Sequence, residues 1–134
     1  MTTTTHIDTH SVVLNYDAVN GIVHHQFQKP VDSQTFRETL TVGAELLIAN
    51  NATKWLSDDR KNTALSDADS AWAIDEWAPQ IIEHGWQHWA LVVPEDAAGR
   101  QSLVNHVFSY TQRGLNVRVF TDADQALAWL INQG

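Results

Sequence analysis

The stretch LNVRVFTDADQALAWL, residues 115–130, contains two hydrophobic periods in succession. Its first half alternates apolar and polar residues, which predicts a β-strand that ends at Phe120. Its second half repeats apolar residues at the spacing of an amphipathic helix. Between the two halves, Thr121 with Asp124 three positions later is typical of a helix N-terminus. The chain therefore ends in a strand followed directly by a helix, the repeating unit of α/β proteins.

Similar units precede this stretch. The run WALVV, residues 89–93, is apolar without a break, which predicts a strand covered by helices on both faces. Pro79 lies inside a helical pattern and is expected to kink it. The elements expected in chain order are strands at 11–17 and 21–29, a helix from Asp32 or Ser33 to about Asn50, a strand at 55–57, a helix from Ser66 to Gly85, a strand at 89–93, a helix at 99–113, and the strand and helix of 115–130.

This order, β-β-α-β-α-β-α-β-α, predicts an α/β fold with a mixed five-stranded sheet and four helices. The last four strands should be parallel, joined by right-handed crossovers, and only the first strand should be antiparallel. We expect residues 1–134 to form a single domain, with residues 1–10 as a polar N-terminal tail.

Composition narrows the function further. The chain has no cysteine, which excludes disulfides and thiolate chemistry, and its N-terminus lacks the apolar core of a secretory signal. We therefore expect a cytoplasmic protein. Sixteen acidic against 8 basic residues give a formal charge of −8, which repels phosphate backbones and anionic lipids. Neither nucleic acid nor a membrane is an expected partner.

No sequence pattern predicts a metal site, a cofactor site or an enzyme. The 7 histidines do not converge, since His24 and His25 should point to opposite faces of a strand and Gly85 separates His84 from His88. The chain contains no Gly-x-Ser-x-Gly elbow, no phosphate-binding loop and no dinucleotide fingerprint. We expect a non-enzymatic protein without a metal or cofactor.

Four short motifs are spread over residues 11–130. They are a W-L-x-D-x-R third strand, a tryptophan-containing second helix, an A-x-V-V-P fourth strand and a terminal F-x-D-x-x-x-A-x-x-W-L. Their residues are Trp55, Leu56, Asp58 and Arg60; Trp72 and Trp77; Ala90, Val92, Val93 and Pro94; and Phe120, Asp122, Ala126, Trp129 and Leu130. In this order the motifs resemble the STAS superfamily, whose members share the SpoIIAA-like fold, and within it uncharacterised bacterial STAS/SEC14-like single-domain proteins.

The resemblance implies a regulatory module that docks a protein partner or a second copy of itself. In anti-sigma-factor antagonists, a serine that follows the third strand is switched by phosphorylation. The segment SDDRKN, residues 57–62, departs from that pattern, and Ser66 is read first as a helix cap. The phosphoserine switch is therefore not transferred to this chain.

Two groups of residues are candidates for a ligand or partner surface. Asp58, Asp59 and Arg60 follow an inner strand, at the sheet edge where open α/β folds bind ligands. They can instead fix a turn, with one aspartate capping the loop and Arg60 paired with the other. Trp72 and Trp77 belong to a tryptophan-rich segment that includes Trp86 and Trp89. These indoles predict either core packing and a homodimer interface, or the wall of a pocket for a small apolar or acidic ligand.

Overall fold

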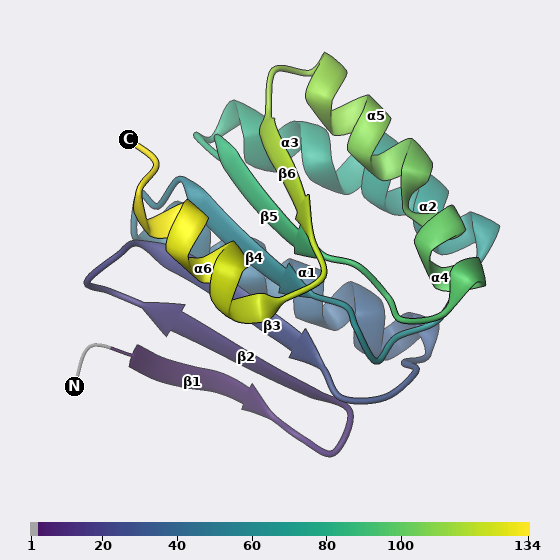
Figure 1. Ribbon diagram of the computed structural model, residues 1–134. Coiled ribbons are helices and arrows are strands. Elements are labelled where there is room, and N and C mark those ends of the chain that lie inside the picture. The colour runs from purple at the N-terminus through teal and green to yellow at the C-terminus, as the bar shows by residue number, and fades with distance from the viewer. Residues whose placement is uncertain (1–2) are drawn as a thin grey trace.

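The computed structural model describes residues 3–134, which form an α/β fold around a mixed six-stranded sheet (Figure 1). The strands lie in the sheet in the same order as in the chain. They are β1 (Thr3–Asp8), β2 (Val12–Asp17), β3 (Ile22–Phe27), β4 (Lys54–Asp58), β5 (His88–Val92) and β6 (Asn116–Phe120). The pairs β1–β2 and β2–β3 are antiparallel, and β3 to β6 are parallel, as expected for the last four strands.

Four helical segments cover the sheet. They are α1 (Ser33–Ala49); the continuous run of α2 (Asp67–Trp72), the π-helix η1 (Ala73–Trp77) and α3 (Ala78–Glu83); α4 (Ala97–Ser102) with α5 (Val104–Gln112); and α6 (Ala123–Ile131). The first three segments lie on one face, over the larger hydrophobic core, and α6 alone lies on the other, over β4, β5 and β6 (Figure 1). Among residues 3–134, no helix has the length and apolar character needed to cross a bilayer.

The sheet has six strands, not five, because residues 3–8 of the expected polar tail form β1. All but Ile7 of these residues are exposed, so β1 carries no apolar alternation that would reveal it in the sequence. Threonine favours extended backbone, and this was the only signal available. Residues 1–2 of the tail lie outside the described residues.

Three details of the helices differ from expectation. At Pro79, where a kink was expected, the turn before the proline widens into the π-helix, and Ala78 N–H donates to the carbonyl of Ala73. This five-residue spacing accommodates a proline that cannot donate a bond of its own. The helix expected at 99–113 is divided at Leu103 into α4 and α5. The last helix is capped by Asp122 rather than Thr121, since the Asp122 carboxylate accepts from the N–H of Asp124.

Candidate functional site

Strand β4 and the residue after it direct three alternate side chains toward the face of the sheet that α1, η1 and α5 cover. Successive side chains of a strand point to opposite faces, so Trp55, Ser57 and, just beyond the strand, Asp59 share one face. Leu56 and Asp58 point to the face that α6 covers. The backbone of Asp59 is held in line by its N–H bond to the carbonyl of Val92.

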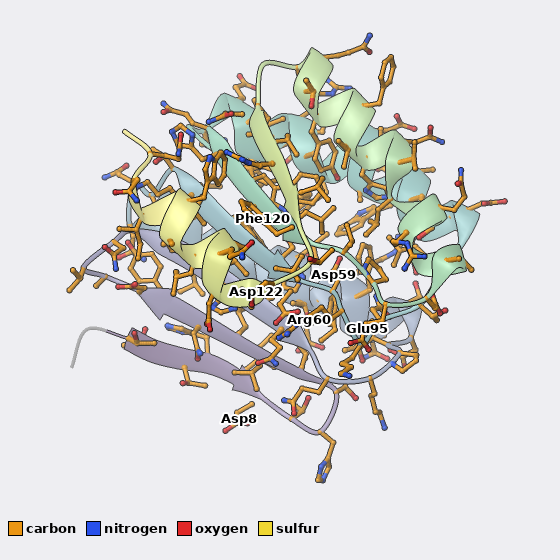
Figure 2. The ribbon with its side chains drawn as sticks, in the orientation of Figure 1. Asp8, Asp59, Arg60, Glu95, Phe120 and Asp122 are labelled. Carbon is orange, nitrogen blue, oxygen red and sulfur yellow. The ribbon has the colours of Figure 1, made fainter. Side chains whose placement is uncertain are left out.

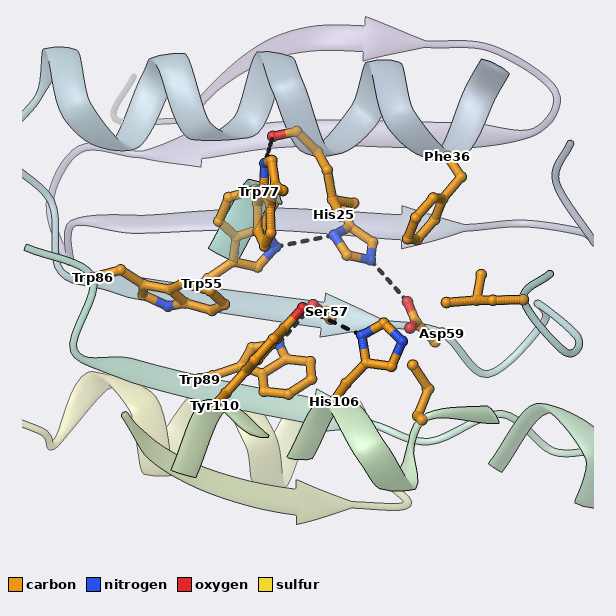
Figure 3. Close-up of a pocket in the computed structure, with 13 residues that line it drawn as sticks. His25, Phe36, Trp55, Ser57, Asp59, Trp77, Trp86, Trp89, His106 and Tyr110 are labelled. Carbon is orange, nitrogen blue, oxygen red and sulfur yellow. Dashed lines mark hydrogen bonds and ion pairs between the residues drawn. The ribbon is translucent and has the colours of Figure 1, made fainter. Parts of the chain in front are cut away.

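These three side chains line a small pocket between the sheet and the helices (Figure 3). The cavity has a volume of about 30 Å³, which is room for one or two water molecules or a few non-hydrogen atoms. Its lining comes from β3, β4, β5, α1, η1, α5 and the connections between them. The lining residues are His25, Phe36, Leu40, Trp55, Ser57, Asp59, Leu65, Trp77, Trp86, Trp89, Leu103, His106 and Tyr110.

Four indoles form most of the apolar wall, and each is held by a hydrogen bond from its Nε1. Trp55 donates to Nδ1 of His25 at 3.0 Å, and Trp89 donates to Oγ of Ser57 at 2.8 Å. Trp77 and Trp86 donate to the backbone carbonyls of Leu40 and His88. The ring centroids of Trp55 and Trp77 lie 5.3 Å apart in an edge-to-face arrangement. The aromatic wall is therefore fixed in orientation.

Two local features allow the indoles to gather. Gly43 on α1 faces the ring of Trp55, and a Cβ at this position would lie 2.7 Å from Cζ2 of that ring. Only glycine lets the helix backbone approach the indole so closely. On the other side of the pocket, the wider turn of η1 ends at Trp77, which is 8% exposed and turned toward α1.

His25 lies between Trp55 and Asp59, and its two ring nitrogens have different roles (Figure 3). An indole N–H can only donate, so Nδ1 of His25 accepts and carries no proton. The proton of the neutral ring is then on Nε2, which donates to Oδ1 of Asp59 at 2.8 Å. Because both nitrogens are engaged, His25 has no free nitrogen to act as a base toward a ligand.

A second histidine, His106 on α5, faces the pocket from the opposite side. Burial lowers its pKa to about 4, and the nearby carboxylate of Asp59 offsets this only in part. At neutral pH the ring is therefore uncharged. Its Nδ1 lies 3.2 Å from the hydroxyl of Tyr110, and its Nε2 lies 3.2 Å from Oγ of Ser70. Burial also raises the pKa of the Tyr110 phenol, which keeps its proton.

The residues expected from the sequence are divided between two sides of the sheet. Asp59 and Trp77 line the pocket. Asp58, which is 2% exposed, lies on the α6 face and is bound by the guanidinium of Arg60 at 2.9 and 2.7 Å. This hydrogen bonding raises the pKa of Arg60. Trp72 is half-buried outside the pocket, under the guanidinium of Arg37 at 5.0 Å.

Arg60 faces a group of acidic residues beyond the carboxyl ends of the parallel strands. Figure 2 shows it near Glu95 and Asp122, which follow β5 and β6. Within residues 3–134, no group of three or more histidine, aspartate or glutamate side chains is arranged to hold a metal ion. Within the same residues, the guanidinium of Arg60 forms an ion pair only with Asp58, and Glu95 pairs instead with Lys61.

Sequence reasoning did not single out His25, Ser57 or His106 as pocket residues. The sequence does predict that His24 and His25 point to opposite faces of the sheet, because successive side chains of a strand alternate. It does not predict the partners of His25, since these depend on the register of β3 against β4. His106 falls on the inner face of an amphipathic helix, where a histidine is not distinguished from any other core position.

Comparisons of the chain with protein-family models, with curated proteins and with solved structures found no match.

Proposed function

We propose that this protein binds a small molecule in the tryptophan-lined pocket, as a carrier or a sensor. The observation that carries the proposal is the combination of a fixed aromatic wall with polar groups directed into the same cavity. Protein cores are close-packed and pair their buried polar groups. An apolar cavity with a few convergent polar groups is the usual form of a small-molecule site.

Two polar atoms of the pocket are available to a ligand. Oγ of Ser57 accepts the indole proton of Trp89, but within residues 3–134 its own hydroxyl proton has no acceptor. Asp59 uses Oδ1 for His25, and its second carboxylate oxygen has no partner within the same residues. A bound molecule with both a donor and an acceptor would satisfy these atoms.

The pocket can also enlarge at two points. Leu65 lies in the irregular segment that precedes α2, and Leu103 lies at the break between α4 and α5. Leu65 lies outside regular secondary structure and Leu103 lies at a helix break, so we expect a ligand larger than the cavity of about 30 Å³ to displace these leucines before the hydrogen-bonded indoles.

Native mass spectrometry of protein purified without denaturant tests this function. We expect an added mass that is lost on denaturation. Spectra of the indole N–H groups provide the second readout, because added fragments should shift Trp55, Trp77, Trp86 and Trp89. Trp129 is an internal control, since it packs on the other face against Phe120 at 5.8 Å.

Ser57→Val fills the cavity and removes its hydroxyl, so this variant should lose both the added mass and the fragment shifts. The proposal is wrong if the wild-type protein retains no mass and no fragment moves the four pocket indoles, or if Ser57→Val binds as well as the wild type. A spectrum dispersed like that of the wild type is the check that the variant is folded.

A second candidate function, a STAS-type regulatory module that associates with a second copy of itself, is favoured by a different surface. Val104 and Phe108 on α5 and Val119 on β6 are 52%, 62% and 47% exposed. Val104 and Val119 border an apolar groove of about 240 Å³, and Phe108 follows Val104 by one turn of α5. The groove lies next to the edge of β6 that pairs with no strand in residues 3–134. Exposed apolar groups beside a free strand edge favour strand pairing between chains.

We expect a homodimer in sedimentation or light scattering that dissociates when Phe108→Ser and Val119→Lys are combined. Val19→Ser is the matched control, because Val19 is 68% exposed but lies in the turn between β2 and β3, away from this surface. A monomeric wild type, or a dimer that survives the double substitution, would rule this surface out.

A further inference from the structure

Asp59 is a carboxylate placed inside the aromatic pocket with an incomplete set of partners. It is 6% exposed, and its one side-chain hydrogen bond in residues 3–134 joins Oδ1 to Nε2 of His25 at 2.8 Å. A buried carboxylate is costly to maintain unless a cation or several donors compensate it.

The contact with His25 does not supply a positive charge. Trp55 donates its indole proton to Nδ1 of His25, so a second proton cannot be placed on the ring without breaking that 3.0 Å bond. The His25–Asp59 contact is therefore a hydrogen bond from a neutral imidazole.

Among the described residues, 3–134, no other group facing the pocket provides a cation. His106 is uncharged at neutral pH because burial lowers its pKa to about 4, and Tyr110 can only be neutral or negative. The guanidinium of Arg60, although adjacent in sequence, bonds to Asp58 on the opposite face of the sheet. The pocket thus combines one carboxylate with no positive charge from its own lining.

The remaining wall suits a cation. Indole faces attract cations through the negative charge of their π systems, and this attraction is strongest in a desolvated site. The chain's formal charge of −8 also raises the local concentration of cations around the molecule. An anionic ligand would meet the carboxylate of Asp59 at close range and in low dielectric, where like charges repel strongly.

We propose that the pocket is specific for a small organic cation, an alkylammonium whose charged head bonds to Asp59 and whose alkyl part lies against the indoles. This inference rests on the proposed binding function and names the chemical class of its ligand. The hydroxyl of Ser57, which already accepts from Trp89, lies on the same face of β4 as Asp59.

Three probes of similar size and different charge test the inference: propylammonium, 1-propanol and acetate. Each is titrated into the protein while the indole N–H resonances are followed, with Trp129 again as the internal control. We expect propylammonium to shift the four pocket indoles and to bind about tenfold or more tightly than either other probe.

Asp59→Asn removes the negative charge but keeps an oxygen that can accept from His25. We expect this variant to lose about tenfold in affinity for propylammonium relative to its affinity for 1-propanol, because only the cation interacts with the charge. Glu83→Gln is the matched control, because it removes the same charge from an exposed position on α3 and should leave both affinities unchanged.

Equal binding of 1-propanol or acetate, or an Asp59→Asn variant with undiminished affinity for propylammonium, would overturn the cation inference and leave the binding function standing. A retained molecule without a cationic group, identified by native mass spectrometry, would do the same. If no probe moves the pocket indoles and no mass is retained, the binding function itself fails.

Discussion

Nε1 of Trp55 lies 3.0 Å from Nδ1 of His25, and this single contact fixes where the imidazole carries its proton. A tryptophan in the centre of the core thereby sets the charge of a pocket side chain. The consequence extends to Asp59, which faces a neutral donor rather than an imidazolium.

We predict that His25 is the Nε2–H tautomer throughout the neutral pH range. Long-range proton–nitrogen correlation spectra should show an unprotonated Nδ1 and a protonated Nε2. In Trp55→Phe the donor is absent, so the ring should lose this strict preference. A protonated Nδ1 in the wild-type protein would contradict the hydrogen-bond assignment.

Gly43→Ala should destabilise the protein, although the same change in the middle of an ordinary helix stabilises it by up to about 1 kcal/mol. The new methyl group would overlap the ring of Trp55, which is 1% exposed and cannot move freely. Overpacking of this kind costs about 1–3 kcal/mol, measured by denaturant unfolding.

The double variant Gly43→Ala with Trp55→Phe is the control for this prediction. A smaller ring makes room for the methyl group, so the two substitutions should be non-additive, with coupling that favours the pair. Strict additivity would mean that the close approach of α1 to the indole is not what the glycine provides.

Stability should fall as the pH is lowered from about 6.5 toward 4, in part because of His106. Burial lowers the pKa of His106 from 6.5 in the unfolded chain to about 4 in the folded protein. Between these values the unfolded chain binds the additional proton, so acid favours unfolding by about 1.4 kcal/mol per pH unit at most.

The contribution of His106 is isolated by comparing unfolding free energies of wild type and His106→Gln over this pH range. The difference between the two should change with pH below about 6.5 and be constant above it, because groups that titrate independently of His106 contribute equally to both proteins. Parallel pH profiles would show that His106 is not held neutral by the fold.

Arg60→Met should cost about 3 kcal/mol of stability, because it leaves Asp58 buried without its partner. The side chain of Arg60 is 34% exposed, so its removal would change stability little if it were only a surface group. Its partner Asp58 has a side chain that is only 3% exposed, and this burial is the reason for the expected loss. Thermal or denaturant unfolding measures the loss. Adding Asp58→Asn to the Arg60→Met variant should recover part of the lost stability, because it removes the unpaired buried charge. If no stability is recovered, the loss does not come from the charge of Asp58.

The sequence predicted the elements of the fold better than the partners of its side chains. Strand periodicity and helix caps are local, so β2 to β6 and the four helical segments fall close to their expected ranges. Strand β1 was missed because its residues other than Ile7 are polar, and only its pairing with β2 makes it a strand.

The candidate site was predicted in part, for a related reason. Asp58 and Asp59 are adjacent and chemically identical, and they differ only in the face of the sheet to which each side chain points. Asp58 points toward Arg60, and Asp59 points into the pocket. Which side chains meet Asp59 depends on the register of β3 against β4, where His25 is paired with Ser57. Register is a property of the assembled sheet and is not encoded in any short segment.

The order of the strands has a consequence for how the chain is made. Every strand pairs with the one that precedes it in the sequence, so the sheet can be built in the direction of synthesis, each new strand adding to an edge already formed. The pocket cannot be completed in this way until late, because α5 supplies His106 and Tyr110. A ribosome-bound chain that stops before α5 would therefore lack the ring of Tyr110, which packs against Trp86 and Trp89 in the finished protein.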